Sequence, residues 1–200
     1  MLRAIKQALA SLWKAFCYTL GVLFIALLLY QSWFAAHIWY WIGHNPQSTS
    51  FMQARLERLR ERNPNATLKQ RWASYTRISD QLKRAVIVAE DAKFSEHDGF
   101  DWEGIQNALA KNQRRGRVVA GGSTITQQLA KNLFLSGERN LWRKGEEAII
   151  TSMLEMLMDK ERILEIYLNV AEWGDGVFGA EAAAQPGRSA RAWFRDFRYA

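Results

Sequence analysis

The sequence predicts a mainly α-helical protein in which one membrane-spanning helix precedes a single soluble domain. Two observations predict this class: a long apolar run without charged residues near the N-terminus, and apolar residues that recur at helical spacing through the rest of the chain. We find no alternating apolar and polar run long enough to indicate a β-strand. The length of 200 residues suits one domain with an appended segment.

The charge of the chain indicates an anionic partner. A formal net charge of +7 is typical of proteins that meet phospholipid head groups, a phosphorylated substrate or nucleic acid. Cys17 is the only cysteine, so a disulfide within the chain is impossible and cysteine usage says little about the compartment. The compartment therefore has to be inferred from the N-terminal segment.

Residues 15–42 contain no Asp, Glu, Lys or Arg, and this run exceeds the roughly 20 residues that a spanning helix needs. Three basic residues precede it in 1–14, and four aromatic residues crowd its far end: Trp33, Trp39, Tyr40 and Trp41. Basic residues on the cytoplasmic side and aromatic rings at the interface are typical of a membrane anchor. A cleaved signal peptide is the competing interpretation, but its apolar part is shorter and ends in small residues. We predict an uncleaved anchor with a cytoplasmic N-terminus, which argues against nucleic acid as the partner.

Residues 43–71 are predicted to form a juxtamembrane stalk. Gly43 and Pro46 interrupt the apolar run, and Ser50 with Gln53 has the spacing of a capping box that opens a short charged helix. The sequence Asn-Pro-Asn at 63–65 ends that helix. The segment is either a stalk near the lipid head groups or a solvated surface helix.

Five helices are predicted in the domain that follows, over residues 72–184, and each begins at or near a polar capping residue. These residues are Asp80, Asp101, Thr124, Asn140 and Asp159. The first helix carries the apolar stripe Leu82, Val86 and Ala89, and the second runs through Ile105 and Leu109. In the third, Thr124 and Gln127 have the spacing of a capping box.

Glu90 falls beside the apolar stripe of the first predicted helix, whereas Asp91 projects away from it. A carboxylate at the edge of an apolar face is partly desolvated, which suits it to proton transfer. An ordinary boundary residue in a salt bridge is the competing interpretation. His97 has no second ligand at a suitable spacing, so we interpret it as a structural hydrogen bonder rather than a zinc ligand.

The third predicted helix gathers polar side chains on one face. These are Thr124, Gln128 and Lys131, with Gln127 alongside, and they lie opposite Ile125, Leu129 and Leu133. The start of this helix is expected to offer free backbone N–H groups to an anion. Lys131 and Arg139, if they converge, would suit a phosphate or pyrophosphate. A solvated helix face is the competing interpretation.

Glu147 lies one helical turn from Arg143 and Lys144. Pairs at this spacing usually stabilise a surface helix slightly and have no other role. The residues alone therefore leave the function of Glu147 open.

Four segments together resemble the monofunctional peptidoglycan glycosyltransferases, whose domain also forms the first catalytic part of bifunctional penicillin-binding proteins. The segments are EDAKFSEHDGFDW at 90–102, GGSTITQQLAKNLF at 121–134, RKGEEA at 143–148 and KERILEIYLNVAEWGDGVFGAEAAA at 160–184. They occur in the order and spacing of that family. The resemblance covers about residues 72–184.

The resemblance implies a lysozyme-like, mainly α glycosyltransferase domain on the periplasmic face of the bacterial inner membrane. The implied reaction is the polymerisation of lipid II into β-1,4-linked glycan strands for the cell wall, with release of undecaprenyl pyrophosphate. The implied partners are lipid II, the growing glycan strand, membrane lipids, penicillin-binding proteins and divisome proteins.

The resemblance also implies roles for single residues. Glu90 matches the general base, and Lys131 and Arg139 match the cations that stabilise the departing pyrophosphate. Glu147 matches a second carboxylate near that phosphate, and with it comes the expectation of a divalent cation, Mg²⁺ or Mn²⁺, held in part by Glu147. Ser123, Thr124, Gln127 and Gln128 match donor-site residues, and Asp91, Phe94 and His97 match residues that surround Glu90.

Residues 185–200 show no match to the family, and Pro186 and Gly187 break any helix there. We hypothesise that a frame change or premature stop has truncated or altered the end of the domain. Two alternatives to the polymerase remain. One is a non-catalytic membrane protein that binds lipid II, and the other is a membrane-bound muramidase, since a lysozyme-like fold with one glutamate also serves hydrolysis. Lys131 and Arg139 favour the polymerase, because hydrolysis of a neutral glycosidic bond releases no pyrophosphate.

Overall fold

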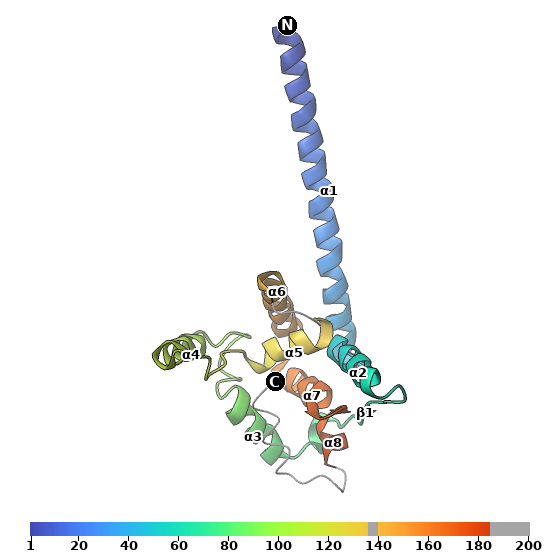
Figure 1. Ribbon diagram of the computed structural model, residues 1–200, viewed down its shortest axis with the longest axis vertical. Helices are drawn as coiled ribbons and strands as arrows, with labels where there is room; N and C mark the ends of the chain where they lie inside the picture. The colour runs from blue at the N-terminus through green and yellow to red at the C-terminus, as the bar shows by residue number, and fades with distance from the viewer. Residues whose placement is uncertain (136–139, 185–200) are drawn as a thin grey trace. The chain divides into compact units, whose positions relative to one another are not determined.

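The computed structural model describes residues 1–135 and 140–184, shown in colour in Figure 1. Its contacts divide the chain into two units, Met1–His37 and a second unit that begins at Ile38. From Leu2 on, the first unit is helical and belongs to helix α1 (Leu2–Gly43). The stretch Leu9–Gly43 has the length and the apolar composition to cross a membrane. Leu23, Phe24 and Ile25 are more than half exposed, as expected of side chains that face lipid.

The second unit is mainly helical, which confirms the predicted fold class. Its helices are α2 (Ser50–Arg62), η1 (Tyr75–Arg77), α3 (Asp80–Glu90), α4 (Trp102–Arg115), α5 (Ile125–Phe134), α6 (Leu141–Leu157), α7 (Lys160–Val170) and α8 (Ala180–Ala183). Three short strands accompany them: β1 (Lys69–Gln70), β2 (Glu172–Gly174) and β3 (Val177–Phe178).

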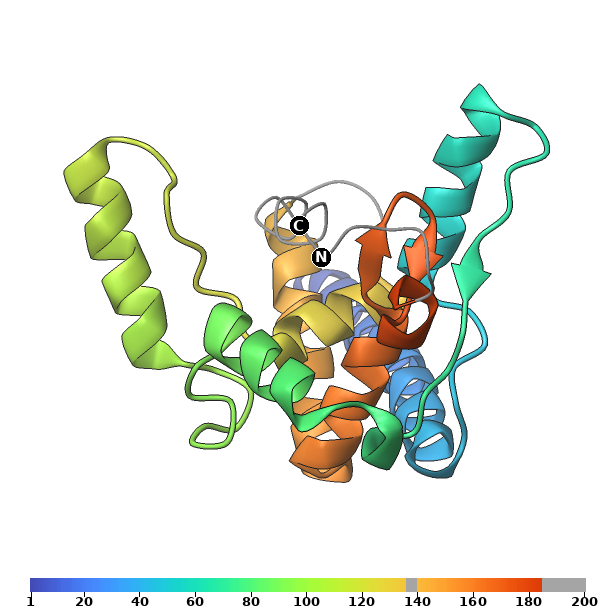
Figure 2. The same ribbon diagram turned by 90° about the horizontal axis from the view of Figure 1, so that it is seen from below.

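Helix α5 lies at the centre of the second unit, where it packs against α2, α6 and α7 (Figure 2). The core around it is formed by fully buried aliphatic side chains of three helices: Ile125, Leu129, Ile150, Leu154, Ile163, Leu164, Ile166 and Leu168. Each buried side chain of this size stabilises the fold by about 1.5–3 kcal/mol relative to its exposed state. Side chains carried by α5 are therefore held on a rigid element.

Most predicted helix starts are confirmed by capping hydrogen bonds. The side chains of Asp101, Thr124, Asn140 and Asp159 each accept a hydrogen bond from the backbone N–H three residues ahead. Two predicted starts are wrong by one residue, because Ser79 caps α3 in place of Asp80, and Thr49 caps α2 in place of Ser50. In both cases two neighbouring residues can cap, and the one with extended backbone angles is the cap.

The buried face of α3 differs from the predicted apolar stripe. Val86 is buried, but Ala89 is exposed and Lys83 is buried in its place. The Lys83 ammonium lies 4.0 Å from the centroid of the Tyr75 ring and forms an ion pair with Asp80 at 2.8 Å. A lysine can cover apolar surface with its stem while its charged end keeps partners. This behaviour is invisible to a pattern that counts only apolar residues.

The second predicted helix is also only partly buried. Leu109 on α4 is 56% exposed, and Ala108 is the buried residue of that helix. Figures 1 and 2 both show α4 to one side of α5, with α2 on the other side. Helix α4 therefore contributes little to the core.

A small sheet closes the second unit, with strand order β1-β3-β2. Strand β1 runs parallel to β3, with Lys69 opposite Val177, and β2 runs antiparallel to β3. The sequence does not predict this sheet, because strands of two or three residues are too short to show alternation.

The segment before η1 is fixed to α7 by side-chain hydrogen bonds. The fully buried Asn169 accepts a hydrogen bond from the Ala73 N–H at 2.7 Å and donates one to the Ala73 carbonyl oxygen at 2.8 Å. The Trp72 indole donates to Glu165 at 3.3 Å. The Asn169 side chain thus provides hydrogen-bond partners for both the N–H and the carbonyl oxygen of Ala73, which has no partner strand.

Arg55 joins α2 to the strand β2, and its removal tests how much this contact contributes. Its Nε donates to Glu172 Oε1 at 2.8 Å, and a second contact reaches Asp175. The hydrogen bond with Glu172 raises the pKa of Arg55 above its usual value. We expect Arg55→Met to lower the free energy of unfolding by about 1 kcal/mol at low salt and by less at high salt, because ion pairs near a surface are screened.

Urea unfolding of the full chain in detergent micelles measures this change. Arg58→Met is the matched control, since Arg58 is exposed on the same helix and should change stability by less than about 0.5 kcal/mol. Equal losses for the two variants, or a loss that is insensitive to salt, would contradict the assignment.

Candidate functional site

Glu90 is the last residue of α3 and faces helix α5. Its side chain is half-buried, and its Oε2 accepts a hydrogen bond from Gln128 Nε2 at 2.9 Å. Within the described residues, Glu90 forms no ion pair with a lysine or arginine. The structure therefore does not support the competing interpretation of Glu90 as an ordinary boundary residue in a salt bridge. A half-buried carboxylate that is hydrogen-bonded but not neutralised is suited to accept a proton.

Gln128 is in turn bonded to Tyr167 on α7. The Tyr167 hydroxyl donates to Gln128 Oε1 at 3.0 Å, and Tyr167 is only 2% exposed. Burial, together with the nearby charges of Glu90 and then Asp91, raises the pKa of Tyr167 well above its usual value. The sequence pattern does not indicate this contact between Tyr167 and Gln128. The available signal was general: a buried tyrosine hydroxyl usually has a hydrogen-bond partner.

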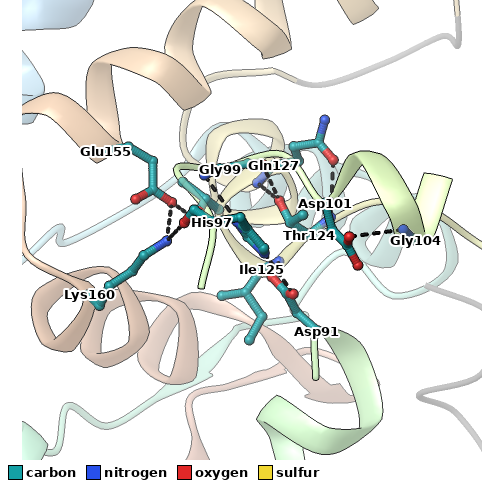
Figure 3. Close-up of polar contacts among 11 residues, drawn as sticks. Asp91, His97, Gly99, Asp101, Gly104, Thr124, Ile125, Gln127, Glu155 and Lys160 are labelled. Carbon is teal, nitrogen blue, oxygen red and sulfur yellow. Dashed lines mark hydrogen bonds and ion pairs between the residues drawn. The ribbon is translucent and has the colours of Figure 1, made fainter. Parts of the chain in front are cut away.

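Asp91 is buried, although a helical wheel places it away from the apolar stripe of the first predicted helix. Helix α3 ends at Glu90, and the non-helical backbone at Asp91 turns its carboxylate inward. As Figure 3 shows, Oδ1 accepts from His97 Nε2 at 2.9 Å and Oδ2 accepts from the Ile125 N–H at 3.1 Å. The carboxylate therefore lies at the N-terminus of α5, where a negative charge is stabilised by the helix dipole.

Both ring nitrogens of His97 are used within the protein. The Gly99 N–H donates to His97 Nδ1 at 3.1 Å, so Nε2 carries the hydrogen that bonds Asp91. The His97 carbonyl oxygen accepts from Lys160 Nζ at 2.6 Å, and the same ammonium lies 4.6 Å from the centroid of the buried Phe94 ring. His97 and Phe94 thus support the segment that follows Glu90.

The capping box at the start of α5 is confirmed. The Gln127 N–H donates to Thr124 Oγ1 at 3.2 Å, and the Thr124 N–H donates to Gln127 Oε1 at 3.0 Å. The Thr124 hydroxyl also donates to the Gly99 carbonyl oxygen at 2.7 Å (Figure 3). The expectation of free N–H groups for an anion is therefore wrong for Ile125 and Gln127, whose N–H groups bond Asp91 and Thr124.

The polar face of α5 is divided between the interior and the boundary. Thr124 and Gln127 are buried, Gln128 and Lys131 are half-buried, and Ser123 just before the helix is exposed. A solvated face is therefore ruled out for Thr124 and Gln127. Gln128 and Lys131 are three residues apart and share one side of the helix. Arg139, the second predicted cation, lies outside the described residues.

Glu147 on α6 is 3% exposed, so it does not lie on a surface helix as the simplest interpretation of its spacing suggested. Its carboxylate pairs with Lys144 and with Arg143, whose Nη1 lies 3.5 Å from Oε2. The part of the chain that the structure describes contains no group of three or more His, Cys, Asp or Glu side chains placed to bind a metal ion. With a cation on each oxygen, Glu147 does not fit a divalent cation held by protein ligands alone.

Thr124→Val tests the hydroxyl that joins the start of α5 to Gly99. Valine has a similar shape, but it neither accepts from the Gln127 N–H nor donates to the Gly99 carbonyl oxygen. We expect the free energy of unfolding to fall by about 1–3 kcal/mol. The neighbouring Ser123→Ala should stay within about 0.5 kcal/mol, because Ser123 is exposed. Thermal unfolding measures both, and a Thr124→Val chain as stable as the original would show that the cap contributes nothing.

Comparisons with known proteins agree with this arrangement. A model of the transglycosylase family matches residues 56–191, so the match extends beyond the expected range 72–184 on both sides. The expectation that no match follows residue 184 is therefore wrong for residues 185–191. A protein of Laribacter hongkongensis named biosynthetic peptidoglycan transglycosylase is 63% identical over 165 residues, covering 82% of this chain and 72% of the relative. Proteins of the same name from Methylobacillus flagellatus and Azoarcus are 63% and 57% identical, covering 80% and 88% of this chain and 70% and 76% of the relatives. The chain therefore belongs to the transglycosylase family and is a glycosyltransferase.

Proposed function

We propose that this chain polymerises lipid II into β-1,4-linked glycan strands of peptidoglycan, with release of undecaprenyl pyrophosphate. The names of the relatives support peptidoglycan as the product. The acceptor and donor are then two lipid-linked molecules, and the 4-hydroxyl of one disaccharide attacks the anomeric carbon of the other.

One observation carries the proposal. Glu90, at the end of α3, is hydrogen-bonded to Gln128 on α5, and Lys131 follows Gln128 by one helical turn. A carboxylate and an ammonium group are thus placed along the same side of one rigid helix. Displacement of a pyrophosphate by a hydroxyl needs both, because one group must remove a proton and another must stabilise the charge that leaves.

In this mechanism Glu90 removes the proton of the attacking 4-hydroxyl as the new bond forms. Lys131, together with Arg139, stabilises the negative charge that develops on the departing pyrophosphate. Base and cation act on opposite sides of one carbon, so the anomeric configuration inverts. Gln128 and the exposed Ser123 are available to the donor, whereas Thr124 and Gln127 act through the cap that fixes the start of α5.

Asp91 and His97 support the segment that follows Glu90 through the hydrogen bonds in Figure 3, and Phe94 supports it through its ring contact with Lys160. A divalent cation remains an expectation from the family. Because Glu147 does not fit such an ion on its own, no step of the mechanism uses a divalent cation. Whether the reaction requires the cation is tested by adding a chelator.

The apolar stretch Leu9–Gly43 supports a membrane-anchored enzyme. We propose that it crosses the inner membrane once, with the basic residues before it in the cytoplasm and the second unit in the periplasm. Lipid II, the nascent strand and membrane lipids are then its partners, and penicillin-binding proteins and divisome proteins are candidate protein partners.

Incubation of the full chain in detergent with labelled lipid II tests the function. Long glycan strands are expected in the presence of Mg²⁺ or Mn²⁺, and addition of a chelator shows whether the cation is needed. Shortened fragments from purified sacculi would instead indicate a muramidase, and retention of lipid II without product would indicate a non-catalytic binder.

A further inference from the structure

Three side chains from three helices form a continuous hydrogen-bonded chain. Tyr167 on α7 donates to Gln128 on α5 at 3.0 Å, and Gln128 donates to Glu90 at the end of α3 at 2.9 Å. The contacts span 39 and 38 residues of sequence, so only the packing of α3, α5 and α7 brings them together.

The order of donors in this chain determines how the Gln128 amide is turned. A glutamine amide has one oxygen that accepts and one NH₂ group that donates. With the Tyr167 hydroxyl donating to the oxygen, the NH₂ group is directed at the Glu90 carboxylate. The reverse orientation would place the amide oxygen against the carboxylate, where two acceptors face each other without a hydrogen.

Tyr167 is well suited to hold this orientation. Its pKa is raised by burial and by the negative charges of Glu90 and Asp91, so the hydroxyl keeps its hydrogen and remains a donor. Its neighbours Ile166 and Leu168 are fully buried, so the ring is carried by a rigid part of α7. An immobile donor is what the orientation of a rotatable amide requires.

We propose that Tyr167 is a positioning residue for Glu90. Tyr167 acts by fixing the orientation of the Gln128 side-chain amide. The proposal rests on the function proposed above, in which Glu90 is the base. With Oε2 held by Gln128, the plane of the carboxylate is set and Oε1 is the oxygen presented to the incoming hydroxyl. Tyr167 itself touches no substrate in this scheme.

Tyr167→Phe removes only the hydroxyl and is the central test. We expect kcat for glycan polymerisation to fall roughly five- to tenfold while KM for lipid II stays within about twofold, because the lost hydrogen bond serves the orientation of the base rather than substrate binding. Tyr75→Phe is the matched control, since Tyr75 is a half-buried residue that takes no part in the hydrogen bonds between Tyr167, Gln128 and Glu90. The kcat of the Tyr75→Phe variant should be unchanged. An unchanged kcat in Tyr167→Phe would overturn the proposal, as would a change confined to KM.

A double-mutant cycle separates action through Gln128 from a general loss of structure. If Tyr167 acts only through Gln128, the double variant Tyr167→Phe/Gln128→Met should polymerise glycan with the same kcat as the single variant Gln128→Met. Independent, multiplying losses would mean that Tyr167 acts by another route and would overturn the proposal.

The side-chain amide of Gln128 gives a readout that does not depend on activity. In ¹⁵N-glutamine-labelled full chain in micelles, the Gln128 NH₂ signal is the one lost in Gln128→Met. We expect it to shift and to exchange faster with water in Tyr167→Phe, but not in Tyr75→Phe. An unshifted signal would overturn the proposal even if kcat fell. A wild-type chain that makes no glycan would refute the proposed function, and the amide signal would still decide whether Tyr167 orients Gln128.

Discussion

Glu90→Gln is expected to stop glycan polymerisation while leaving lipid II binding largely intact. Glutamine has nearly the same shape, and its side-chain oxygen can still accept the hydrogen bond from Gln128. It cannot take up the proton of the attacking hydroxyl at neutral pH. Loss of a positioned general base usually costs about 10²–10⁴-fold in rate. Strand formation from labelled lipid II measures the rate, and retention of lipid II on the immobilised full chain measures binding.

Glu96→Gln supplies the control for this experiment. Glu96 lies six residues beyond Glu90 in the same segment, but it is exposed, so its replacement should leave the polymerisation rate unchanged. A Glu90→Gln chain that polymerises at a near-normal rate would remove Glu90 from the role of base. If both variants lost activity equally, general disturbance of the segment would be the better explanation.

Gly99→Ala is expected to be the most destabilising small substitution in the segment that follows Glu90 and leads to α4. Gly99 has φ +87°, a conformation that residues with a Cβ rarely adopt, and an added Cβ would lie 2.7 Å from Thr151 Cγ2 and 3.1 Å from Glu155 Cγ. The left-handed backbone costs about 1–2 kcal/mol and the overpacking about 1–3 kcal/mol, so the total is about 2–5 kcal/mol. Movement of Gly99 would also disturb its hydrogen bonds to His97 and Thr124.

Chemical unfolding of the full chain in micelles measures this loss, and Gly145→Ala is the control. Gly145 lies within α6, and an added Cβ there would meet no atom within 4 Å. Since alanine favours a helix over glycine, Gly145→Ala should raise the stability by about 0.5–1 kcal/mol. Equal stability of the Gly99→Ala chain and the original would show that the segment adapts without cost.

Features encoded by neighbouring residues could be predicted from the sequence. The capping box needs only Thr124 and Gln127, three residues apart, and the caps at Asn140 and Asp159 are equally local. Where two adjacent residues can both cap, as at Ser79 and Asp80, the sequence cannot choose, because the choice depends on how the preceding backbone enters the helix.

Contacts between distant segments could not be predicted in this way. Asp91 bonds the N–H of Ile125, 34 residues away, and this contact depends on how α3 ends and where α5 begins. A helical wheel assumes that α3 continues, and so it places Asp91 on the wrong side. The partnership of Tyr167 with Gln128 likewise appears only when α5 and α7 are packed together.

The pairing of β1 with β3 also sets an order of events during synthesis. Lys69 pairs with Val177, and Ala73 bonds Asn169 across 96 residues of sequence, so the early segment has no place to bind until the late one exists. At about 5–20 residues per second, the ribosome needs roughly 5–20 s to make the chain between the two strands. During that interval the edge of β1 lacks its partner strand, and we expect chaperones to act on this segment then.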